Sequence, residues 1–278
     1  MRIVHELDAF RAACDEARGR GARVGLVPTM GALHEGHLAL VDRAAEADFR
    51  VVTIFVNPLQ FRENEDLDQY PRTLETDAAA CEARGVDLIF APSPAAMYPT
   101  GFSTSVTVAG VTEPLEGTHR PGHLQGVTTV VSKLFLLTGP CLAVFGRKDY
   151  QQWRTIVRMV RDLSFPVEVV GHPIVREADG LALSSRNRYL SAEDRTRALG
   201  LSRGLAAAED AWNAGERDAD VLRSITRAPV AEVTDRIDYV DVVDPDDLRS
   251  LRGVVETATV VIAAHVGATR LIDNRELA

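Results

Sequence analysis

The first 174 residues alternate between short apolar runs and longer segments with helical spacing. The apolar runs predict strands at 23–27, 50–56, 86–90, 141–145 and 166–171, and the segments of helical period predict helices at 6–18, 36–47, 73–84 and 150–162. Runs such as VVTIFV are apolar almost without interruption, which is typical of a parallel sheet with helices on both faces. We therefore expect a doubly wound, Rossmann-like α/β domain.

The pattern changes after residue 174. Two Ala-rich helical segments, 193–214 and 218–227, precede three strand-like runs at 236–244, 258–266 and 269–274. This order predicts a smaller α+β domain. We therefore expect two domains, 1–174 and 175–278, with no Gly/Ser-rich linker between them.

The segment PTMGALHEGH, residues 28–37, lies where a predicted strand is followed by a helix. In a parallel sheet this is where phosphates bind, because the positive end of the helix meets the carboxyl edge of the sheet. Gly31 allows close approach of the backbone, and Gly36 opens the helix without a side chain. His34 and His37 can then donate hydrogen bonds to phosphate oxygens and follow charge that develops on phosphorus.

Other interpretations of this segment differ in spacing. A zinc-protease helix requires H-E-x-x-H, whereas His34 and His37 are only three residues apart and no cysteine cluster supplies further ligands. The segment is also not the P-loop pattern G-x-x-x-x-G-K-[ST]. A purely structural role, with both histidines capping the helix, stays open.

PTMGALHEGH resembles the HxGH signature of the nucleotidylyltransferase and class I aminoacyl-tRNA synthetase superfamily. Five further blocks resemble, in order, those of the pantothenate synthetase family: IFVNPLQF (54–61), YPRT (70–73), LEGTHRPGHLQGV (115–127), VFGRKDYQQ (144–152) and READGLALSSRNRYL (176–190). The similarity covers nearly the whole chain. It implies an ATP-dependent ligase that condenses pantoate with β-alanine through a pantoyl adenylate and releases AMP and pyrophosphate.

The resemblance also implies roles for individual residues. The catalytic set is His34, His37, Lys148 and Arg186. The ATP-binding set is Met30, Gly31, Ala32, Leu33, His34, Glu35, Gly36, His37, Gly146, Arg147, Lys148, Asp149, Val175, Leu183, Ser184, Ser185 and Arg186. The resemblance implies an acidic residue where this chain has Arg147, so a local ion pair is expected to be lost or replaced here, with Lys148 and Asp149 unaffected. For Ser184 and its neighbours, a capped helix start is the structural alternative.

The set implied for pantoate and β-alanine is Met30, Asn57, Gln60, Phe61, Arg120, His123 and Gln152. Glutamine amides can bind hydroxyls and carboxylates without adding charge. Asn57 either orients a ligand or ends a strand before Pro58. Mg²⁺ is expected with ATP, and Asp77 is its candidate partner, directly or through water, with a surface-helix role as the alternative. Residues 116–126 are expected to form part of a lid, as is the C-terminal domain.

Composition narrows the class of protein further. A net charge of -9 argues against a nucleic-acid binder, and the absence of a long apolar run or signal sequence favours a cytoplasmic protein that does not span a membrane. Among the 31 basic residues, only Lys133 and Lys148 are lysine and the others are arginine. Either a compact ammonium is required at these two positions, or the two lysines reflect a drift in composition alone. The three cysteines follow no metal or disulfide spacing and are expected to be buried.

Two other functions are considered beside the ligase. An HxGH nucleotidylyltransferase acting on a phosphorylated substrate would need a second cationic pocket, whereas Gln60 and Gln152 are neutral. A non-catalytic nucleotide-binding module would tolerate missing motif residues, yet His34, His37 and Lys148 are all present. The resemblance also implies a homodimer.

Overall fold

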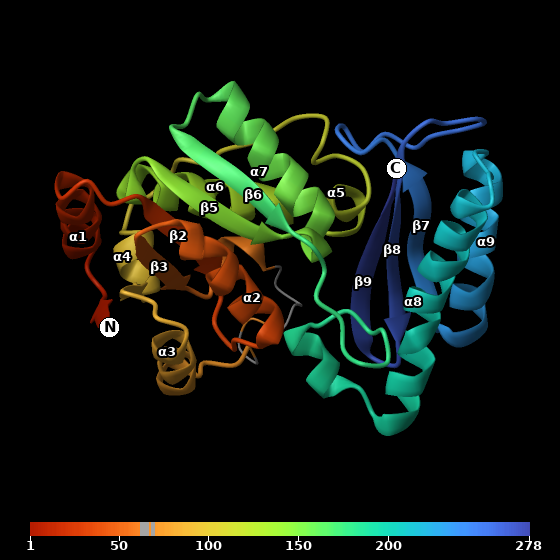
Figure 1. Ribbon diagram of the computed structural model, residues 1–278, viewed down its shortest axis with the longest axis horizontal. Helices are drawn as coiled ribbons and strands as arrows, with labels where there is room; N and C mark the ends of the chain where they lie inside the picture. The colour runs from red at the N-terminus through yellow and green to blue at the C-terminus, as the bar shows by residue number, and fades with distance from the viewer. Residues whose placement is uncertain (62–66, 68–69) are drawn as a thin grey trace. The chain divides into compact units, whose positions relative to one another are not determined.

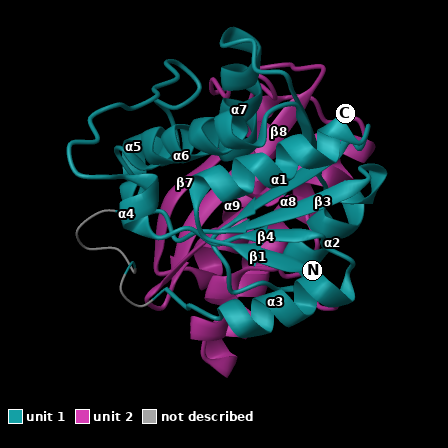
Figure 2. Ribbon diagram, turned by 90° about the vertical axis from the view of Figure 1, so that its left-hand side faces the viewer, with its two compact units in different colours: residues 1–147, 152–173 teal, residues 148–151, 174–278 magenta. Residues whose placement is uncertain are grey.

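The computed structural model describes residues 1–61, 67 and 70–278 (Figure 1). It divides into two compact units, residues 1–147 with 152–173 and residues 148–151 with 174–278 (Figure 2). The four residues 148–151 thus belong to the second unit, although they precede the boundary expected at 174. Each unit has its own hydrogen-bonded sheet.

In the described residues, the first unit contains a six-stranded sheet in the order β1-β4-β3-β2-β5-β6, and every pair is parallel. Its strands are β1 (Arg2–Val4), β2 (Val24–Thr29), β3 (Phe49–Ile54), β4 (Leu88–Phe90), β5 (Cys141–Gly146) and β6 (Val167–His172). Strand β2 pairs with β3 on one side and β5 on the other, so the winding reverses there. The predicted doubly wound fold is confirmed, and the carboxyl ends of β2 and β5 flank its switch point.

Helices cover the two faces of this sheet. They are α1 (Leu7–Gly19), α2 (Glu35–Arg43), α3 (Leu74–Ala83), α4 (Pro94–Met97), α5 (Glu116–His119), α6 (His123–Thr138) and α7 (Tyr150–Asp162), with 3-10 turns η1 (Ala44–Glu46), η2 (Pro58–Gln60) and η3 (Arg147–Asp149). Helix α1 contacts α6 and β2, whereas α2 contacts α3, β5 and β6. Figure 2 shows α1 and α3 on opposite sides of the sheet. Residues such as Val27, Val41, Val52 and Leu142 form the core under α2 and α3.

Helix α6 was not predicted from the sequence. Twelve of its 16 residues are buried, so it shows no polar face to mark a helical period. Several of them are β-branched, which lowers helix propensity. Its contacts with α1, α5, β2 and η2 explain why packing overrides that preference.

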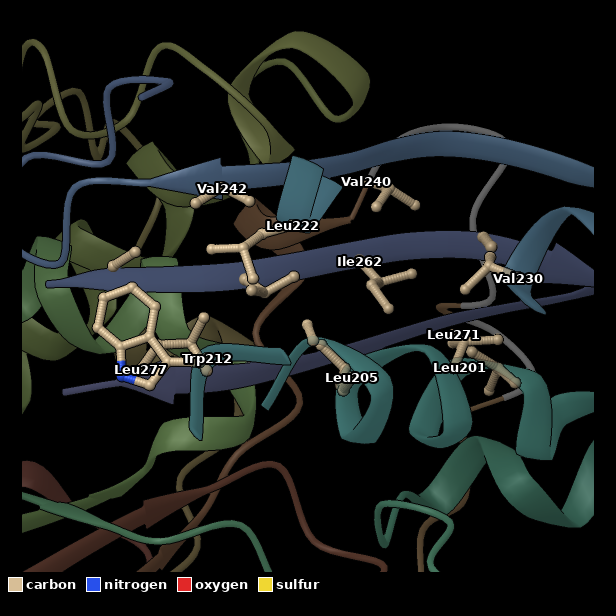
Figure 3. Close-up of a cluster of buried hydrophobic side chains, with 14 of the residues drawn as sticks. Leu201, Leu205, Trp212, Leu222, Val230, Val240, Val242, Ile262, Leu271 and Leu277 are labelled. Carbon is tan, nitrogen blue, oxygen red and sulfur yellow. The ribbon is translucent and has the colours of Figure 1, made fainter. Parts of the chain in front are cut away.

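The second unit has, in the part of the chain described, a three-stranded antiparallel sheet in the order β7-β8-β9. Its elements are η4 (Ser185–Tyr189), α8 (Ala192–Asn213), α9 (Ala219–Val233), β7 (Arg236–Val243), β8 (Ala258–Val266) and β9 (Thr269–Leu277). Figure 3 shows Leu205, Leu222, Val240 and Ile262 among the side chains that fill the space between its helices and its sheet. The predicted α+β character is confirmed.

Helix α9 extends beyond its predicted end at residue 227 and passes through Pro229. Proline inside a helix removes one backbone hydrogen bond and normally costs about 3 kcal/mol. Burial offsets this cost, because Val230 is fully buried in the core. Gly204 of α8 also allows close packing, since a Cβ there would lie 2.6 Å from the carbonyl oxygen of Thr226 on α9.

Cys14, Cys81 and Cys141 are free and buried, as expected. Burial raises the pKa of each thiol to about 12, so all three remain protonated and unreactive. Within the described ranges, we find no helix with the length and apolar character that crossing a bilayer demands.

Candidate active site

The turn between β2 and α2 is held in an unusual backbone conformation. Gly31 and Ala32 both have positive φ, 82° and 52°, a region that disfavours alanine by about 1–2 kcal/mol. The turn is anchored by Asp77 of α3, whose Oδ2 accepts from Ala32 N at 2.9 Å and whose Oδ1 accepts from Leu33 N at 2.8 Å. The hydroxyl of Thr73 donates to Oδ2 at 3.2 Å. A buried carboxylate therefore fixes the shape of the turn that leads into the histidine pair.

His34 and His37 each place Nδ1 against a backbone N–H at the start of α2. Nδ1 of His34 accepts from Gly36 N at 3.1 Å, and Nδ1 of His37 accepts from His34 N at 3.4 Å. A ring nitrogen that accepts from N–H carries no proton, so each neutral imidazole is protonated on Nε2. The ring centroids are 4.1 Å apart. The two histidines therefore do cap the helix, and this cap makes Nε2–H the donor end of both rings.

The beginning of α2 follows directly from β2, one of the two strands that flank the switch point. Positive partial charge at this helix end favours an anion. Glu35 does not oppose an anion with an unpaired charge, because its carboxylate pairs with Arg84 at 2.8 Å. Arg84 also pairs with Asp42 of α2. On the other side of the switch point, β5 ends at Gly146.

Asn57 and Gln60 form a buried amide pair beside this edge of the sheet. Asn57 Nδ2 donates to Gln60 Oε1 at 3.0 Å and to Gly126 O at 3.1 Å. Asn57 Oδ1 accepts from the hydroxyl of Tyr98 at 2.8 Å. Gln60 Nε2 in turn lies 3.0 Å from the sulfur of Met30. Asn57 also caps η2 through Leu59 N. Strand β3 has already ended at Ile54, so Asn57 orients Gln60 and caps η2 but does not end the strand.

Residues 116–126, which were expected to form part of a lid, contact the segment η2. His123 Nδ1 lies 2.8 Å from the carbonyl oxygen of Gln60, and since a carbonyl only accepts, Nδ1 carries the proton. Gly126 packs so closely that a Cβ would lie 2.1 Å from the carbonyl oxygen of Leu59. The segment is therefore bonded to and packed against η2, and its part in a lid stays a prediction.

The other residues expected to bind the carboxylate substrates also belong to the first unit. Arg120 Nη2 donates to Gln60 O at 3.4 Å. The ring of Phe61 packs edge-on against Tyr70, with centroids 5.9 Å apart. Gln152 lies in the first turn of α7. Arg120 and His123 thus both contact the segment that carries Gln60.

Arg147, where the resemblance led us to expect an acidic residue, has its own contacts within the first unit. Its Nε donates to Gly171 O on β6 at 3.1 Å. Its guanidinium lies 5.0 Å from the ring centroid of Trp153, and that of Arg154 is also 5.0 Å away. Each guanidinium is within the distance at which a cation interacts favourably with an aromatic ring. The arginine at this position is therefore used in packing against Trp153.

Lys148 belongs to the second unit, where its backbone is fixed by β9. Asn274 Nδ2 donates to the carbonyl oxygen of Lys148 at 2.9 Å. The ammonium is 4.0 Å from Asp149 Oδ2. The hydroxyl of Tyr150 donates to Pro245 O at 3.1 Å in the same unit. The lysine side chain thus extends from a well-anchored backbone and is only partly balanced by Asp149.

The segment READGLALSSRNRYL forms a hairpin followed by η4. Leu183 N donates to Val175 O at 3.0 Å, and Ser184 Oγ accepts from Arg186 N at 3.2 Å. Asn187 Nδ2 donates to Glu177 Oε1 at 2.9 Å. Ser184 is therefore a helix cap, as the structural alternative proposed, and this cap sets the backbone on which Ser185 and Arg186 follow.

A model of the family described as pantoate–β-alanine ligase matches residues 2–276. The chain is 53% identical to pantothenate synthetase of Roseiflexus castenholzii over 99% of its own length and 98% of that protein. It is 51% identical to that of Moorella thermoacetica, again covering 99% of this chain and 98% of the relative.

The chain belongs to the pantoate–β-alanine ligase family.

Solved structures agree with this assignment. The crystal structure of pantothenate synthetase from Thermus thermophilus matches with a TM-score of 0.94 and 48% identity, covering 100% of this chain and 99% of that one. Pantoate–β-alanine ligase from Francisella tularensis, complexed with βγ-ATP and β-alanine, matches at 0.81 and 31% identity, covering 99% and 97%. As a member of this family the protein is an enzyme of the ligase class.

The geometry of Asp77 does not fit a ligand of Mg²⁺. Its carboxylate is almost completely buried, and both oxygens accept hydrogen bonds from the turn at Ala32 and Leu33. Among the described residues, no cluster of His, Cys, Asp and Glu is arranged to hold a metal. Its burial also contradicts the surface-helix alternative. Asp77 is instead a structural anchor of the turn.

We expect Asp77→Asn to destabilise the fold by about 2 kcal/mol or more, because an amide NH₂ would face a backbone N–H donor and one charge-assisted bond would be lost. Chemical unfolding measures this change. Turnover is expected to fall because the turn before His34 loosens, while the Mg²⁺ concentration for half-maximal activity stays constant. Glu75→Gln on the exposed face of α3 is the matched control. A shift in the Mg²⁺ requirement alone would contradict the anchor role.

Tyr98 is a site residue that the sequence did not indicate. It lies 41 positions from Asn57 in the chain, and only the fold brings its hydroxyl to that side chain. Buried polar side chains are normally hydrogen-bonded, but a sequence does not tell which distant group is the partner. We found no signal in the sequence that would have predicted this contact.

Proposed function

We propose that this chain condenses pantoate with β-alanine at the expense of ATP, through a pantoyl adenylate. Family membership over residues 2–276 supports this function. The single structural observation that carries it is the pair of Nε2–H donors at the beginning of α2, formed because both Nδ1 atoms accept from backbone N–H groups. Neutral donors at a helix N-terminus suit the phosphates of ATP.

The proposed reaction has two steps. A pantoate carboxylate oxygen attacks the α-phosphorus of ATP, and the bond to pyrophosphate breaks. The amine of β-alanine then attacks the acyl carbon, loses a proton and displaces AMP. Because both reactants of the first step are anions, the main work of the protein is to neutralise charge and align the groups. No covalent nucleophile is required.

In this proposal residues 1–174 bind ATP and pantoate. His34 and His37 donate to phosphate oxygens, and the turn from Met30 to Leu33 supports ATP through its backbone. Gln60 and Gln152 bind pantoate, Met30 and Phe61 pack against its methyl groups, and Arg120 and His123 lie nearby. Their proximity within the first unit supports the assignment for Gln60, Arg120 and His123.

The C-terminal domain is proposed to act as a lid domain that supplies further groups to ATP. Lys148 contributes a compact positive charge to the triphosphate, with Asp149 beside it. Arg186 contributes a guanidinium, and Ser184 and Ser185 contribute hydroxyl and backbone groups. Gly146, Arg147, Val175 and Leu183 complete the proposed ATP-binding set by position in the sequence.

Mg²⁺ is proposed to arrive with ATP and to supply further charge neutralisation, with few protein ligands. The burial of Asp77 excludes it from that role in our proposal. We also propose that the protein is a cytoplasmic homodimer. We propose no nucleic-acid partner, because a net charge of -9 would repel the phosphate backbone.

Isotope exchange tests the adenylate step directly. With ATP, Mg²⁺ and pantoate, but without β-alanine, labelled pyrophosphate is expected to enter ATP, because the first step is reversible. Omission of pantoate should abolish exchange. An enzyme that forms pantothenate without such exchange would rule out the adenylate, and turnover of phosphorylated acceptors in place of pantoate would favour a nucleotidylyltransferase.

A further inference from the structure

The Asn57 amide has a single orientation that its partners permit. Leu59 N–H can only donate, and it points at Oδ1 at 3.3 Å. Gly126 C=O can only accept, and it lies 3.1 Å from Nδ2. The oxygen and nitrogen of Asn57 are therefore assigned by backbone groups. Tyr98, whose hydroxyl is 2.8 Å from Oδ1, must accordingly be a donor.

The orientation of Asn57 determines that of Gln60. Asn57 Nδ2 donates to Gln60 Oε1 at 3.0 Å, so the carbonyl end of Gln60 is engaged inside the protein. The NH₂ end points toward the sulfur of Met30 at 3.0 Å. Thioether sulfur is only a weak acceptor. A substrate oxygen would therefore be a stronger partner for Gln60 Nε2 than the one it has.

We propose that Tyr98 is a positioning residue that, through Asn57, holds Gln60 as a hydrogen-bond donor toward pantoate. The proposal rests on the proposed function, because it takes pantoate to be the ligand of Gln60. It adds a direction to that contact. Gln60 offers its NH₂ group to an oxygen that accepts, such as a carboxylate or a hydroxyl lone pair, while its carbonyl oxygen faces Asn57.

The surroundings of Tyr98 suit this role. Burial raises the pKa of its phenol well above the ordinary value, so the hydroxyl keeps its proton and remains a donor over any working pH. Its ring packs 5.0 Å from that of Phe102 and 6.1 Å from that of Phe55. The ammonium of Lys133 lies 5.0 Å from the Phe102 centroid and 5.9 Å from that of Tyr98. One of the two lysines of the chain thus packs against the rings that hold the hydroxyl in place.

The decisive variant is Tyr98→Phe, which removes only the hydroxyl. We expect the KM for pantoate to rise about 3- to 10-fold, as for loss of one neutral hydrogen bond. The kcat, the KM values for ATP and β-alanine and the melting temperature are expected to change little. Tyr239→Phe on β7 of the second unit is the matched control. An unchanged KM for pantoate in Tyr98→Phe would overturn the proposal.

A double-mutant cycle separates positioning from a general loss of fit. Gln60→Ala removes the group through which Tyr98 is proposed to act, so Tyr98→Phe should add less than about twofold to the KM of Gln60→Ala. If the two effects multiply instead, Tyr98 acts by another route and the proposal is wrong.

Spectroscopy without substrate distinguishes this inference from the proposed function. With asparagine and glutamine labelled by ¹⁵N, the Gln60 side-chain signal is identified by its loss in Gln60→Ala. Tyr98→Phe is expected to shift the Asn57 and Gln60 NH₂ signals, whereas Tyr239→Phe should not. If the signals shift but the enzyme does not use pantoate, the proposed function is wrong and the positioning of Gln60 by Tyr98 through Asn57 is still supported. If the signals do not shift, the positioning role of Tyr98 is wrong, whichever substrate the enzyme uses.

Discussion

Replacing His37 with alanine is expected to lower turnover by about two orders of magnitude or more, the usual cost of losing a donor that stabilises developing charge. The structure gives the physical reason, because the Nδ1 contact to His34 N fixes Nε2–H as the donor end of the ring. Alanine removes both the Nε2–H donor and the Nδ1 contact. Loss of the cap contact should reduce the free energy of unfolding by only about 1 kcal/mol. Turnover and chemical unfolding, measured on the same preparation, therefore separate chemistry from stability.

His5→Ala is the matched control for this variant. His5 is an exposed histidine of the same unit, and its Nδ1 lies 2.7 Å from the carbonyl oxygen of Ala91. Its removal should leave turnover unchanged. Wild-type turnover in His37→Ala would exclude His37 from the mechanism. If turnover falls only because the variant is largely unfolded under the assay conditions, His37 has a structural role only.

Lys148→Ala is expected to reduce both overall turnover and pyrophosphate exchange by about two orders of magnitude or more, because an ammonium that offsets the charge of the triphosphate is lost. The fold should survive this change. The contact that anchors Lys148 to β9 uses its backbone carbonyl and Asn274 Nδ2, and neither atom is altered. Within the described part of the chain, the ammonium pairs with Asp149 at the long distance of 4.0 Å.

The matched control for the loss of a cation is Arg252→Ala in the same unit, since Arg252 is 68% exposed and pairs with Asp220. Surface ion pairs of this kind contribute about 0–1 kcal/mol, so its activity should stay near that of the wild type. If Lys148→Ala keeps its exchange rate but loses overall turnover, the lysine acts in amide formation rather than in adenylation. Normal rates for both would remove it from the proposed ATP site.

Strands β2 to β6 and the longer helices α1, α2, α3 and α7 were predictable because their periodicity is strong. Strand β1 was not predicted, because it has only three residues and two of them are exposed. The near-continuous apolar runs at β2, β3 and β5 indicated a parallel sheet, and α7 was predicted with the bounds that the structure has. Helix α6 was missed because a helix buried on nearly all sides has no polar face. Helix α9 was predicted too short because Pro229 is a local stop signal that core packing overrides.

For the candidate site, the residue types and their spacing within a short segment were informative. The sequence did not indicate which distant residues form hydrogen bonds with them. HxGH at a strand-to-helix turn indicated the histidine pair and the helix cap. Nothing in the linear order pairs Asp77 with Ala32 and Leu33, since 45 and 44 positions separate them. The metal role expected for Asp77 does not fit the structure, because both carboxylate oxygens accept hydrogen bonds from backbone N–H groups of the turn. The sequence could not show these partners.

The linear order of side chains was sufficient for the fold class, the family resemblance and the segment in which the chemistry lies, because hydrophobic period and local motifs act over a few residues. Hydrogen-bond direction was decided by the folded structure. Which nitrogen of His37 carries the proton depends on the backbone at the start of α2. Which end of Gln60 faces Asn57 depends on the orientation of Asn57, which Gly126 and Tyr98 fix from distant parts of the chain. Such assignments require three-dimensional contacts, because an imidazole or an amide has two chemically different ends that sequence spacing cannot distinguish.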